Sequence, residues 1–179
     1  MGKLVITEFI SLDGVIEDPA WTFDFDQGDA QAFKGDELRS ADAQLLGRVT
    51  YEGFAAAWPT MEGTGWFGEK FNAMPKFVVS TTLENPEWNN TTVLRGDLAD
   101  EVGKLKEQFD GDILLAGSAT LAQSLIERDL VDEINLMVFP ILLGKGKRLF
   151  GEIDVPRTLE LVETKATGSV VILIFRRKA

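Results

Sequence analysis

Short runs of apolar residues recur along the chain and predict a series of β-strands. The runs cover residues 4–10, 44–46, 76–80, 91–94, 112–116, 133–139, 158–163 and 169–175. Residues 77–79 and 113–116 are apolar without interruption, which is typical of strands that are covered on both faces. The pattern therefore favours a central sheet that lies between two layers of other structure.

Three stretches between these runs have the apolar spacing of helices. In 97–109, Leu98, Val102 and Leu105 share one face, and Asp97 stands where a helix N-cap is expected. In 118–128, apolar residues again share one face, and Ser118 is the candidate N-cap. Residues 49–57 follow a Gly-Arg pair and end before Trp-Pro, so we predict a helix there as well.

The order of the elements predicts the class of fold. Strands alternate with helices up to about residue 130, and strands follow strands after it. We therefore expect an α/β fold with a mostly parallel central sheet, helices on both faces and a C-terminal antiparallel hairpin. No linker or repeat interrupts residues 1–179, which we expect to form one domain. Residues 18–28 have no period and form either a mobile loop over a site or a surface loop pinned by Trp21, Phe23 and Phe25.

The chain contains no histidine and no cysteine. The lack of cysteine excludes disulfides, thiolate metal sites and a cysteine nucleophile. The lack of histidine removes the usual general base and the commonest metal ligand, so we expect no metal. Chemistry that is carried by an organic cofactor is affected least by these absences.

The charge of the chain is strongly acidic, with 29 acidic and 18 basic residues and a net charge of −11. Such a surface repels phosphate backbones, so we expect no nucleic-acid partner. The short basic clusters 145–148 and 176–178 are interpreted as a solvated loop and a solvated tail, and the first is also suited to a small anion. The first ten residues resemble a strand rather than a signal peptide, and no apolar run has the length of a membrane span. We therefore expect a cytoplasmic protein without a membrane partner.

Three predicted strands end in residues that suit phosphate binding. Gly47 and Arg48 follow the second strand, a run of hydroxyl residues at 80–82 follows the third, and small residues at 116–120 follow the fifth. Ligands of parallel sheets bind beyond the carboxyl ends of the strands, where N–H groups at helix N-termini meet phosphate. Each junction alone is also compatible with a tight turn or an ordinary helix start, but the three together favour a nucleotide site. Neither the GxGxxG fingerprint nor the P-loop motif is present.

Motifs at these junctions resemble the dihydrofolate reductase family. GRVTYE at 47–52 is similar to the family's GR-x-T-[YW]-E segment, and FVVSTT at 77–82 is similar to its second cofactor segment. Four further segments resemble, in the same order, the C-terminal reductase domain of RibD, the bifunctional deaminase/reductase of riboflavin biosynthesis. They are SLDGVI at 11–16, AGS at 116–118, LVDEI at 130–134 and PILLGKG at 140–146. The resemblance spans nearly the whole chain.

The resemblance implies a dihydrofolate reductase-like fold that binds NADPH. It assigns the phosphates to Gly47, Arg48 and Thr50, and the adenosine end to Ser80 and Thr81. A run of consecutive residues would line the pyrophosphate and nicotinamide side: Ala116, Gly117, Ser118, Ala119, Thr120 and Leu121. The first loop would lie beside the nicotinamide through Asp13, Gly14, Val15 and Ile16. Arg48 would also favour NADPH over NADH, because a guanidinium can hold a 2′-phosphate bidentately.

Two features depart from the family pattern. Ala116 stands where the family commonly has the first glycine of a pair, so its methyl group narrows the approach of the cofactor. In dihydrofolate reductases, the helix before the GR segment carries a pterin-binding carboxylate. Gln31 and Phe33 lie closest to that place here, and acidic residues stand only nearby, at 29, 36 and 37. We therefore expect a substrate other than folate.

Asp13 is our candidate for the catalytic acid. It either orients or protonates the substrate beside the nicotinamide or makes an Asx-type turn ahead of Gly14. Similarly, four large aromatic residues either form a substrate wall or pack in the core and at its rim. They are Trp21, Phe54, Trp58 and Trp66.

Together, these features predict an NADPH-dependent reductase that passes a hydride to a C=N or C=O group of a small molecule, such as a pterin or a pyrimidine. A protein that kept the fold and binds NADP(H) without catalysis is the alternative. A third interpretation is a dimeric interaction module, suggested by the apolar run 170–175. Because such a run is unusual for an exposed edge strand, we also expect a homodimer.

Overall fold

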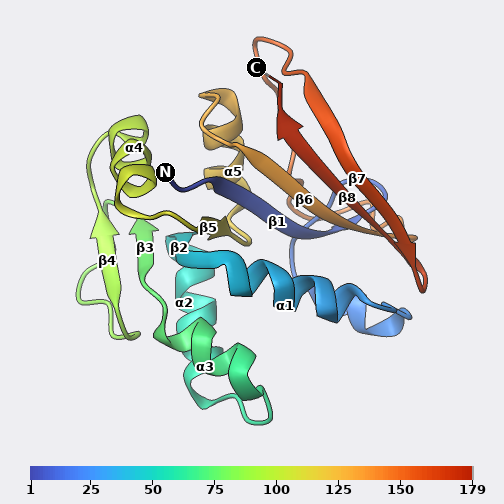
Figure 1. Ribbon diagram of the computed structural model, residues 1–179, viewed down its shortest axis with the longest axis horizontal. Coiled ribbons are helices and arrows are strands. Elements are labelled where there is room, and N and C mark those ends of the chain that lie inside the picture. The colour runs from blue at the N-terminus through green and yellow to red at the C-terminus, as the bar shows by residue number, and fades with distance from the viewer. Residues whose placement is uncertain (179) are drawn as a thin grey trace.

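The computed structural model describes residues 1–178 and contains one eight-stranded sheet in the order β4-β3-β2-β5-β1-β6-β8-β7 (Figure 1). The strands are β1 Leu4–Ser11, β2 Ala41–Gly47, β3 Lys76–Val79, β4 Thr91–Leu94, β5 Asp112–Leu115, β6 Glu133–Phe139, β7 Leu159–Thr167 and β8 Val170–Arg177. Neighbours from β4 through β6 are parallel, whereas β8 is antiparallel to both β6 and β7. The predicted α/β sheet with a C-terminal antiparallel hairpin is confirmed.

Helices cover both faces of this sheet (Figure 1). They are α1 Ala30–Ser40, α2 Arg48–Ala57, α3 Gly65–Ala73, α4 Leu98–Gln108 and α5 Ala119–Glu127, with 3₁₀ helices at Pro19–Asp24 and Trp58–Thr60. In β1, Leu4 and Ile6 belong to the core beneath α4 and α5, whereas Val5 packs with α1 and α3. Alternate side chains of one strand therefore serve opposite layers. Within residues 1–178, no helix is long and apolar enough to cross a membrane.

The N-terminus of α4 has the capping residue that the sequence predicts. The Asp97 carboxylate accepts hydrogen bonds from the backbone N–H groups of Ala99 at 2.9 Å and Asp100 at 3.3 Å. These two bonds lower the pKa of Asp97 and satisfy two of the free N–H groups of the first turn. The predicted N-cap Asp97 is therefore confirmed.

The sequence did not predict α1 and α3, because neither helix has a regular apolar stripe. The buried residues of α1 are Ala30, Gly35, Glu37 and Leu38, of which one is a carboxylate. α3 contains two glycines and packs through aromatic rings, with Phe71 only 4.3 Å from Trp58 between ring centroids. Contacts with distant segments, rather than local periodicity, stabilise these two helices.

The segment 18–28 is packed rather than free. The rings of Trp21 and Phe25 lie edge-on against Phe139, with centroids at 5.4 and 5.8 Å. Phe23, by contrast, is 82% exposed. The prediction of a pinned surface loop is therefore correct for Trp21 and Phe25 and wrong for Phe23.

The apolar C-terminal strand is not an edge strand, so the apolar run 170–175 does not indicate a dimer. β8 lies between β6 and β7, and its residues Val170 and Ile172 are buried. The edge strand on this side of the sheet is β7, where Leu161 is 52% exposed and Val162 is 41% exposed. The homodimer itself stays a prediction. The candidate surface for it is now the exposed part of the β7–β8 hairpin.

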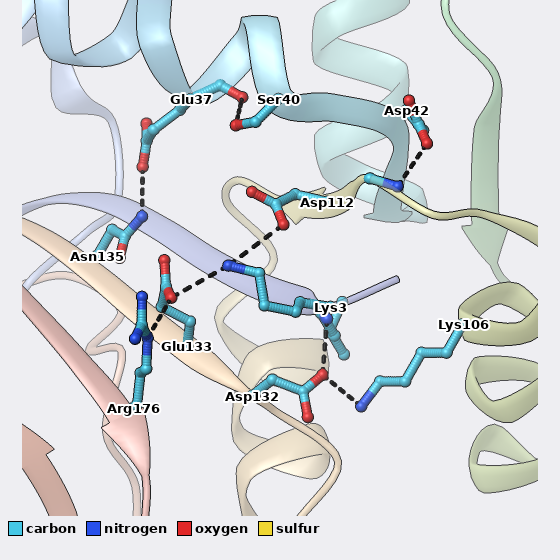
Figure 2. A network of polar contacts seen from close by, with 12 residues as sticks. Lys3, Glu37, Ser40, Asp42, Lys106, Asp112, Asp132, Glu133, Asn135 and Arg176 are labelled. Carbon is cyan, nitrogen blue, oxygen red and sulfur yellow. Dashed lines mark hydrogen bonds and ion pairs between the residues drawn. The ribbon is translucent and has the colours of Figure 1, made fainter. Parts of the chain in front are cut away.

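Ion pairs fasten the amino ends of the parallel strands (Figure 2). The Glu133 carboxylate accepts hydrogen bonds from Arg176 at 3.0 Å and from Lys3 at 3.3 Å. Lys3 also lies 3.4 Å from Asp112, and Lys106 lies 2.5 Å from Asp132. These charges pair with one another across neighbouring strands and loops, so their role is structural.

Lys76, the first residue of β3, is completely buried. Its ammonium donates to the carbonyls of Asn72 at 2.6 Å, Met74 at 2.9 Å and Asn89 at 2.9 Å, and lies 4.3 Å from the centroid of a Trp88 ring. Burial lowers the pKa of Lys76 to about 8. The three carbonyls match the three N–H donors of an ammonium group, so Lys76 ties together the two loops that flank β3.

Candidate functional site

The sheet opens at the carboxyl ends of its central strands. β1 pairs with β5 only from Leu4 to Ile6, whereas its pairing with β6 continues to Ser11. Beyond Ile6, β5 leaves the sheet through Ala116 and Gly117 to begin α5. In parallel sheets, an opening of this kind is the usual position of a bound ligand.

Two of the predicted phosphate junctions meet at this opening. The Ser118 hydroxyl accepts a hydrogen bond from the Gly47 N–H at 2.7 Å and donates to the Thr50 hydroxyl at 2.9 Å. A Cβ atom at Gly47 would lie 2.6 Å from the Ser118 Oγ, and one at Gly117 would lie 2.8 Å from the Thr50 Cγ2. Only glycine fits at both positions, so the ends of β2 and β5 are held in direct contact.

Ser118 therefore has a different role from the predicted one. It occupies the N-cap position of α5 in a left-handed conformation, with φ of 57°, and its side chain makes no capping bond to the helix. Its hydroxyl is used to bridge α5 to Gly47 and Thr50 instead. The prediction of Ser118 as a capping side chain is wrong, although its position at the helix start is correct.

The first turn of α5 presents backbone rather than side chains. Ala119 and Leu121 are buried in the main core, Ala116 and Gly117 are half-buried, and Thr120 is exposed. The first N–H groups of a helix have no partner within the helix, so they are available to an anion. Any contact of Ala119 or Leu121 with a cofactor phosphate would therefore be made by the main chain.

The third junction forms a hollow of about 380 Å³ at the ends of β3 and β4. It is lined by Arg48, Val79, Ser80, Thr81, Thr82, Leu94, Arg95 and Gly96. Two guanidinium groups and three hydroxyl residues in one hollow suit a phosphate ester. The structure therefore brings the predicted Arg48, Ser80 and Thr81 together.

Arg95 was not predicted, although it follows β4 as directly as Arg48 follows β2. Its guanidinium donates to the backbone carbonyls of Ser80 at 3.1 Å and Leu83 at 2.5 Å. Arg48 forms two hydrogen bonds with Glu52 at 2.9 and 3.1 Å. Arg95 is therefore held by the loop it borders, whereas Arg48 is held by a carboxylate of its own helix.

Asp13 lies in the loop after β1, and its carboxylate is hydrogen-bonded to Ser11 and to the distant loop 141–149. Its carboxylate accepts from the Ser11 hydroxyl at 2.6 Å and from the N–H groups of Leu143 at 3.1 Å and Gly144 at 2.7 Å. These bonds, with that of Ser11 the strongest, lower the pKa of Asp13 to about 2. Such a carboxylate is ionised at neutral pH and holds the loop 11–16 against the loop 141–149. These contacts favour a structural role over that of a proton donor. The expected Asx-type turn is not formed, because the Val15 N–H donates to the Ser11 hydroxyl and the Asp13 carboxylate binds the distant loop instead.

Gly14 and Ile16, the cofactor contacts predicted in this loop, are tied to the same neighbour. The Gly14 carbonyl accepts from the Leu149 N–H, and the Ile16 N–H donates to the Lys147 carbonyl. The Ile16 side chain is buried in the main core. The loop that resembles the nicotinamide segment is therefore hydrogen-bonded to the loop 141–149 and anchored in the core.

Glu8 is a buried carboxyl that sequence reasoning missed. It is 6% exposed and lies on β1 at the opening, where its Oε1 accepts a hydrogen bond from the Gly117 N–H at 2.6 Å. Burial raises the pKa of Glu8 to about 8, against the smaller opposing effects of the Gly117 bond and Lys34. A glutamate inside a mostly apolar strand was the available signal.

A second buried polar cluster lies on the other face of the same strands. The Glu37 carboxylate of α1 accepts from the Thr7 hydroxyl at 2.9 Å, from the Asn135 amide at 2.9 Å (Figure 2) and from the Lys34 ammonium at 2.8 Å. Lys34 also donates to the Thr7 hydroxyl at 2.5 Å. This cluster fixes α1 to β1 and β6 beneath the opening.

The aromatic residues proposed as a substrate wall are dispersed. Phe54 and Trp58 pack against Phe71, Trp21 packs against Phe139, and Trp66 lies beneath the Arg39 guanidinium. The alternative of core and rim packing is therefore correct for these residues.

Another hollow, of about 360 Å³, lies at the opposite end of the sheet between α5, the start of β6 and the segment before β7. Arg177 in its lining pairs with Asp129 and Asp132, and Arg157 donates to the Glu127 carbonyl. None of the predicted cofactor residues lines it. The candidate site is therefore the carboxyl edge.

Known proteins resemble this chain over its length. Residues 2–173 match the family described as the RibD C-terminal domain. The chain is 30% identical over 175 residues to the uncharacterized protein YyaP of Bacillus subtilis, covering 96% of this chain and 93% of YyaP. It is 27% identical over 179 residues to the uncharacterized protein YwjB of the same organism, covering 98% of each.

Solved structures share the fold. A putative riboflavin biosynthesis protein from Shewanella sp. PV-4 has a TM-score of 0.80 at 23% identity, with 99% of each chain covered. A pyrimidine reductase-like protein from Corynebacterium diphtheriae has a TM-score of 0.67 at 13% identity, covering 99% of this chain and 92% of that protein. Acinetobacter baumannii RibD has a TM-score of 0.68 at 17% identity, and this chain spans 59% of it. The protein thus belongs to the RibD C-terminal domain family and has the fold of that reductase domain.

Proposed function

We propose that this protein is an NADPH-dependent reductase of a small molecule with a C=N or C=O group, of the pyrimidine or pterin kind. The observation that carries the proposal is the hollow at the ends of β3 and β4, where Arg48 and Arg95 flank a run of hydroxyl residues. Membership of the RibD C-terminal domain family and the pyrimidine reductase-like structural relative support the same reaction class.

The residues present fit such a cofactor. Arg48, Arg95 and the hydroxyls of Ser80 and Thr81 would hold the adenosine end with its 2′-phosphate. The N–H groups at the start of α5 would meet the pyrophosphate, beside the bridge that Ser118 makes to Gly47 and Thr50. When bound, NADPH supplies the hydride. The protein would then position the two reactants at the opening between β1 and β5.

Calorimetric titration of NADPH and NADH tests the cofactor. We expect tighter binding of NADPH, and Arg95→Ala and Arg48→Ala should each weaken it by about tenfold or more, since a hydrogen bond to a charged group is worth roughly 1.5–3 kcal/mol. Arg48 should give the smaller loss, because Glu52 competes for its guanidinium. Arg157→Ala, at the opposite end of the sheet, is the matched control. Equal affinities for both cofactors, or no binding of either, would refute the site.

A non-catalytic NADP(H)-binding protein is the second candidate. It is favoured by the engagement of Asp13 in structural bonds and by the absence of histidine. Substrate-dependent oxidation of NADPH, followed by absorbance over a panel of pterins, pyrimidine ribitylamines and small carbonyls, separates the two. Turnover of any member supports the reductase, whereas NADPH binding without turnover across the panel supports the alternative.

We propose in addition that the protein forms a homodimer through the β7–β8 hairpin. Leu161, Val162 and Val171 are apolar and 37–52% exposed on it. Leu161 and Val162 lie on the edge strand β7, and exposed apolar residues on an edge strand are commonly covered by a partner.

A further inference from the structure

Glu8 occupies the point at which the central sheet opens. The last pair between β1 and β5 joins Ile6 to Leu115, so Glu8 stands two residues beyond it. It shares the face of Leu4, Ile6 and Ile10, which belong to the core beneath α5. Burying a carboxyl in this row costs free energy, so an apolar residue is expected at this position.

The carboxyl of Glu8 supports the turn that precedes α5. Its Oε1 lies 2.6 Å from the Gly117 N–H, and Gly117 and Ser118 have successive left-handed conformations, with φ of 76° and 57°. On its other side, the same turn is held by Thr50, which accepts from the Ser118 hydroxyl and whose side chain leaves no room for a Cβ atom at Gly117. The turn therefore lies between Thr50 and Glu8.

Few charges act on Glu8 from the elements around it. Lys34 and Glu37, both from α1, are the charged groups that influence it, and they act in opposite directions. Lys34 is already paired with Glu37 at 2.8 Å, and no ion pair within residues 1–178 includes Glu8. Burial accordingly keeps the pKa of Glu8 near 8.

We propose that Glu8 is a positioning residue of the dinucleotide site: its carboxyl supports the Gly117–Ser118 turn and must be uncharged for the turn to accept an anionic ligand. The inference rests on the proposed function, because the ligand meant is the pyrophosphate of NADPH. An ionised Glu8 would put a negative charge on the Gly117 N–H, directly before the N–H groups of the first turn of α5 that would meet this anion. Binding of the dinucleotide and ionisation of Glu8 therefore oppose each other.

This opposition has a measurable size. If the dinucleotide binds only when Glu8 is protonated, the Kd for NADPH increases about tenfold between pH 7 and pH 9. Binding also takes up protons, about half a proton for each NADPH at pH 8 and nearly one at pH 9. The 2′-phosphate is fully ionised throughout this range, so it contributes little to either quantity.

The experiment is isothermal titration of NADPH into the full chain at pH 7, 8 and 9, in two buffers with different ionisation enthalpies. Glu8→Gln retains an acceptor for the Gly117 N–H and cannot ionise, so its ratio of Kd at pH 9 to Kd at pH 7 should be near one. Glu133→Gln, a buried carboxylate at the other end of the sheet, should keep the tenfold ratio. Lys76 also has a pKa of about 8, but it is present in all three proteins and so cannot cause a difference between them.

The inference is overturned if the wild-type Kd is constant from pH 7 to pH 9, or if Glu8→Gln keeps the tenfold ratio. Proton uptake by the wild type is decisive even if a variant does not fold, and an uptake near zero at pH 8 and pH 9 overturns the inference. In these cases NADPH still binds and the proposed function stands. Absence of NADPH binding at every pH would overturn both.

Discussion

The buried carboxyl of Glu8 makes the stability of the protein depend on pH in a direction that is unusual for a carboxyl. Burial raises the pKa of Glu8 from 4.5 to about 8. Between these values the folded state binds the proton and the unfolded state does not, so the free energy of unfolding falls as pH rises. The contribution is fully present below pH 4.5 and is lost as pH passes through about 8.

The size of this loss follows from the shift in pKa. One pKa unit corresponds to about 1.4 kcal/mol, and the linkage relation gives a decrease of about 3–4 kcal/mol between pH 5 and pH 8. Glu8→Gln is always neutral and retains an acceptor for Gly117, so it should lack this decrease. The remaining carboxyls titrate in both proteins, and the difference between the two curves therefore isolates Glu8.

Urea unfolding at pH 5, 6, 7 and 8, followed by the fluorescence of the 4 tryptophans, measures both curves. Between pH 5 and pH 8, we expect the free energy of unfolding of the wild type to fall by about 3 kcal/mol more than that of Glu8→Gln. Glu133→Gln, which removes a buried carboxylate paired with Lys3 and Arg176, should leave the slope of the wild type in place. Parallel curves for wild type and Glu8→Gln, within about 1 kcal/mol, would refute the assignment of a raised pKa to Glu8.

Three further predictions concern single features. Lys76→Met removes the donor of three backbone carbonyls and should lower the free energy of unfolding by about 2–4 kcal/mol in urea, whereas a loss below about 1 kcal/mol would contradict a structural role. Asp13→Asn should lower the melting temperature, because an amide cannot accept all three hydrogen bonds, and should reduce turnover by less than about tenfold; a loss of a hundredfold or more would instead identify a proton donor. Light scattering at micromolar concentration should find a dimer that Leu161→Glu weakens, and a wild-type monomer would disprove the dimer.

The sequence alone determined those parts of the fold that depend on local patterns. Alternation and apolar runs located the strands, because the side-chain period of a strand can be read over a few residues. Asp97 was identifiable as an N-cap because its bonds reach only two and three residues ahead. The junctions at Gly47, Ser80 and Gly117 were likewise readable, since small and hydroxyl residues after a strand mark a turn at the edge of a sheet.

Only the tertiary structure decided which of these pieces meet. Ser118 resembles a capping residue in sequence, but its hydroxyl binds Gly47 because β2 and β5 are neighbours in the sheet. Arg95 joins Arg48 in one hollow because β4 lies next to β3, and no local pattern contains that order. The apolar β8 is likewise covered by β7 because of the order of the strands in the sheet, which the sequence pattern does not contain.

Burial of single polar residues was also decided by the fold. The helix α1 forms without an apolar stripe, because Glu37 is satisfied by donors from β1 and β6 that are distant in sequence. Whether Glu8 faces water or the core depends on where β5 ends relative to β1, which is a matter of register between strands. The alternation of residues along a strand assigns each side chain to one face of the sheet. The pKa of a carboxyl on that face depends on its dielectric environment, which is set by the distant residues that cover the face.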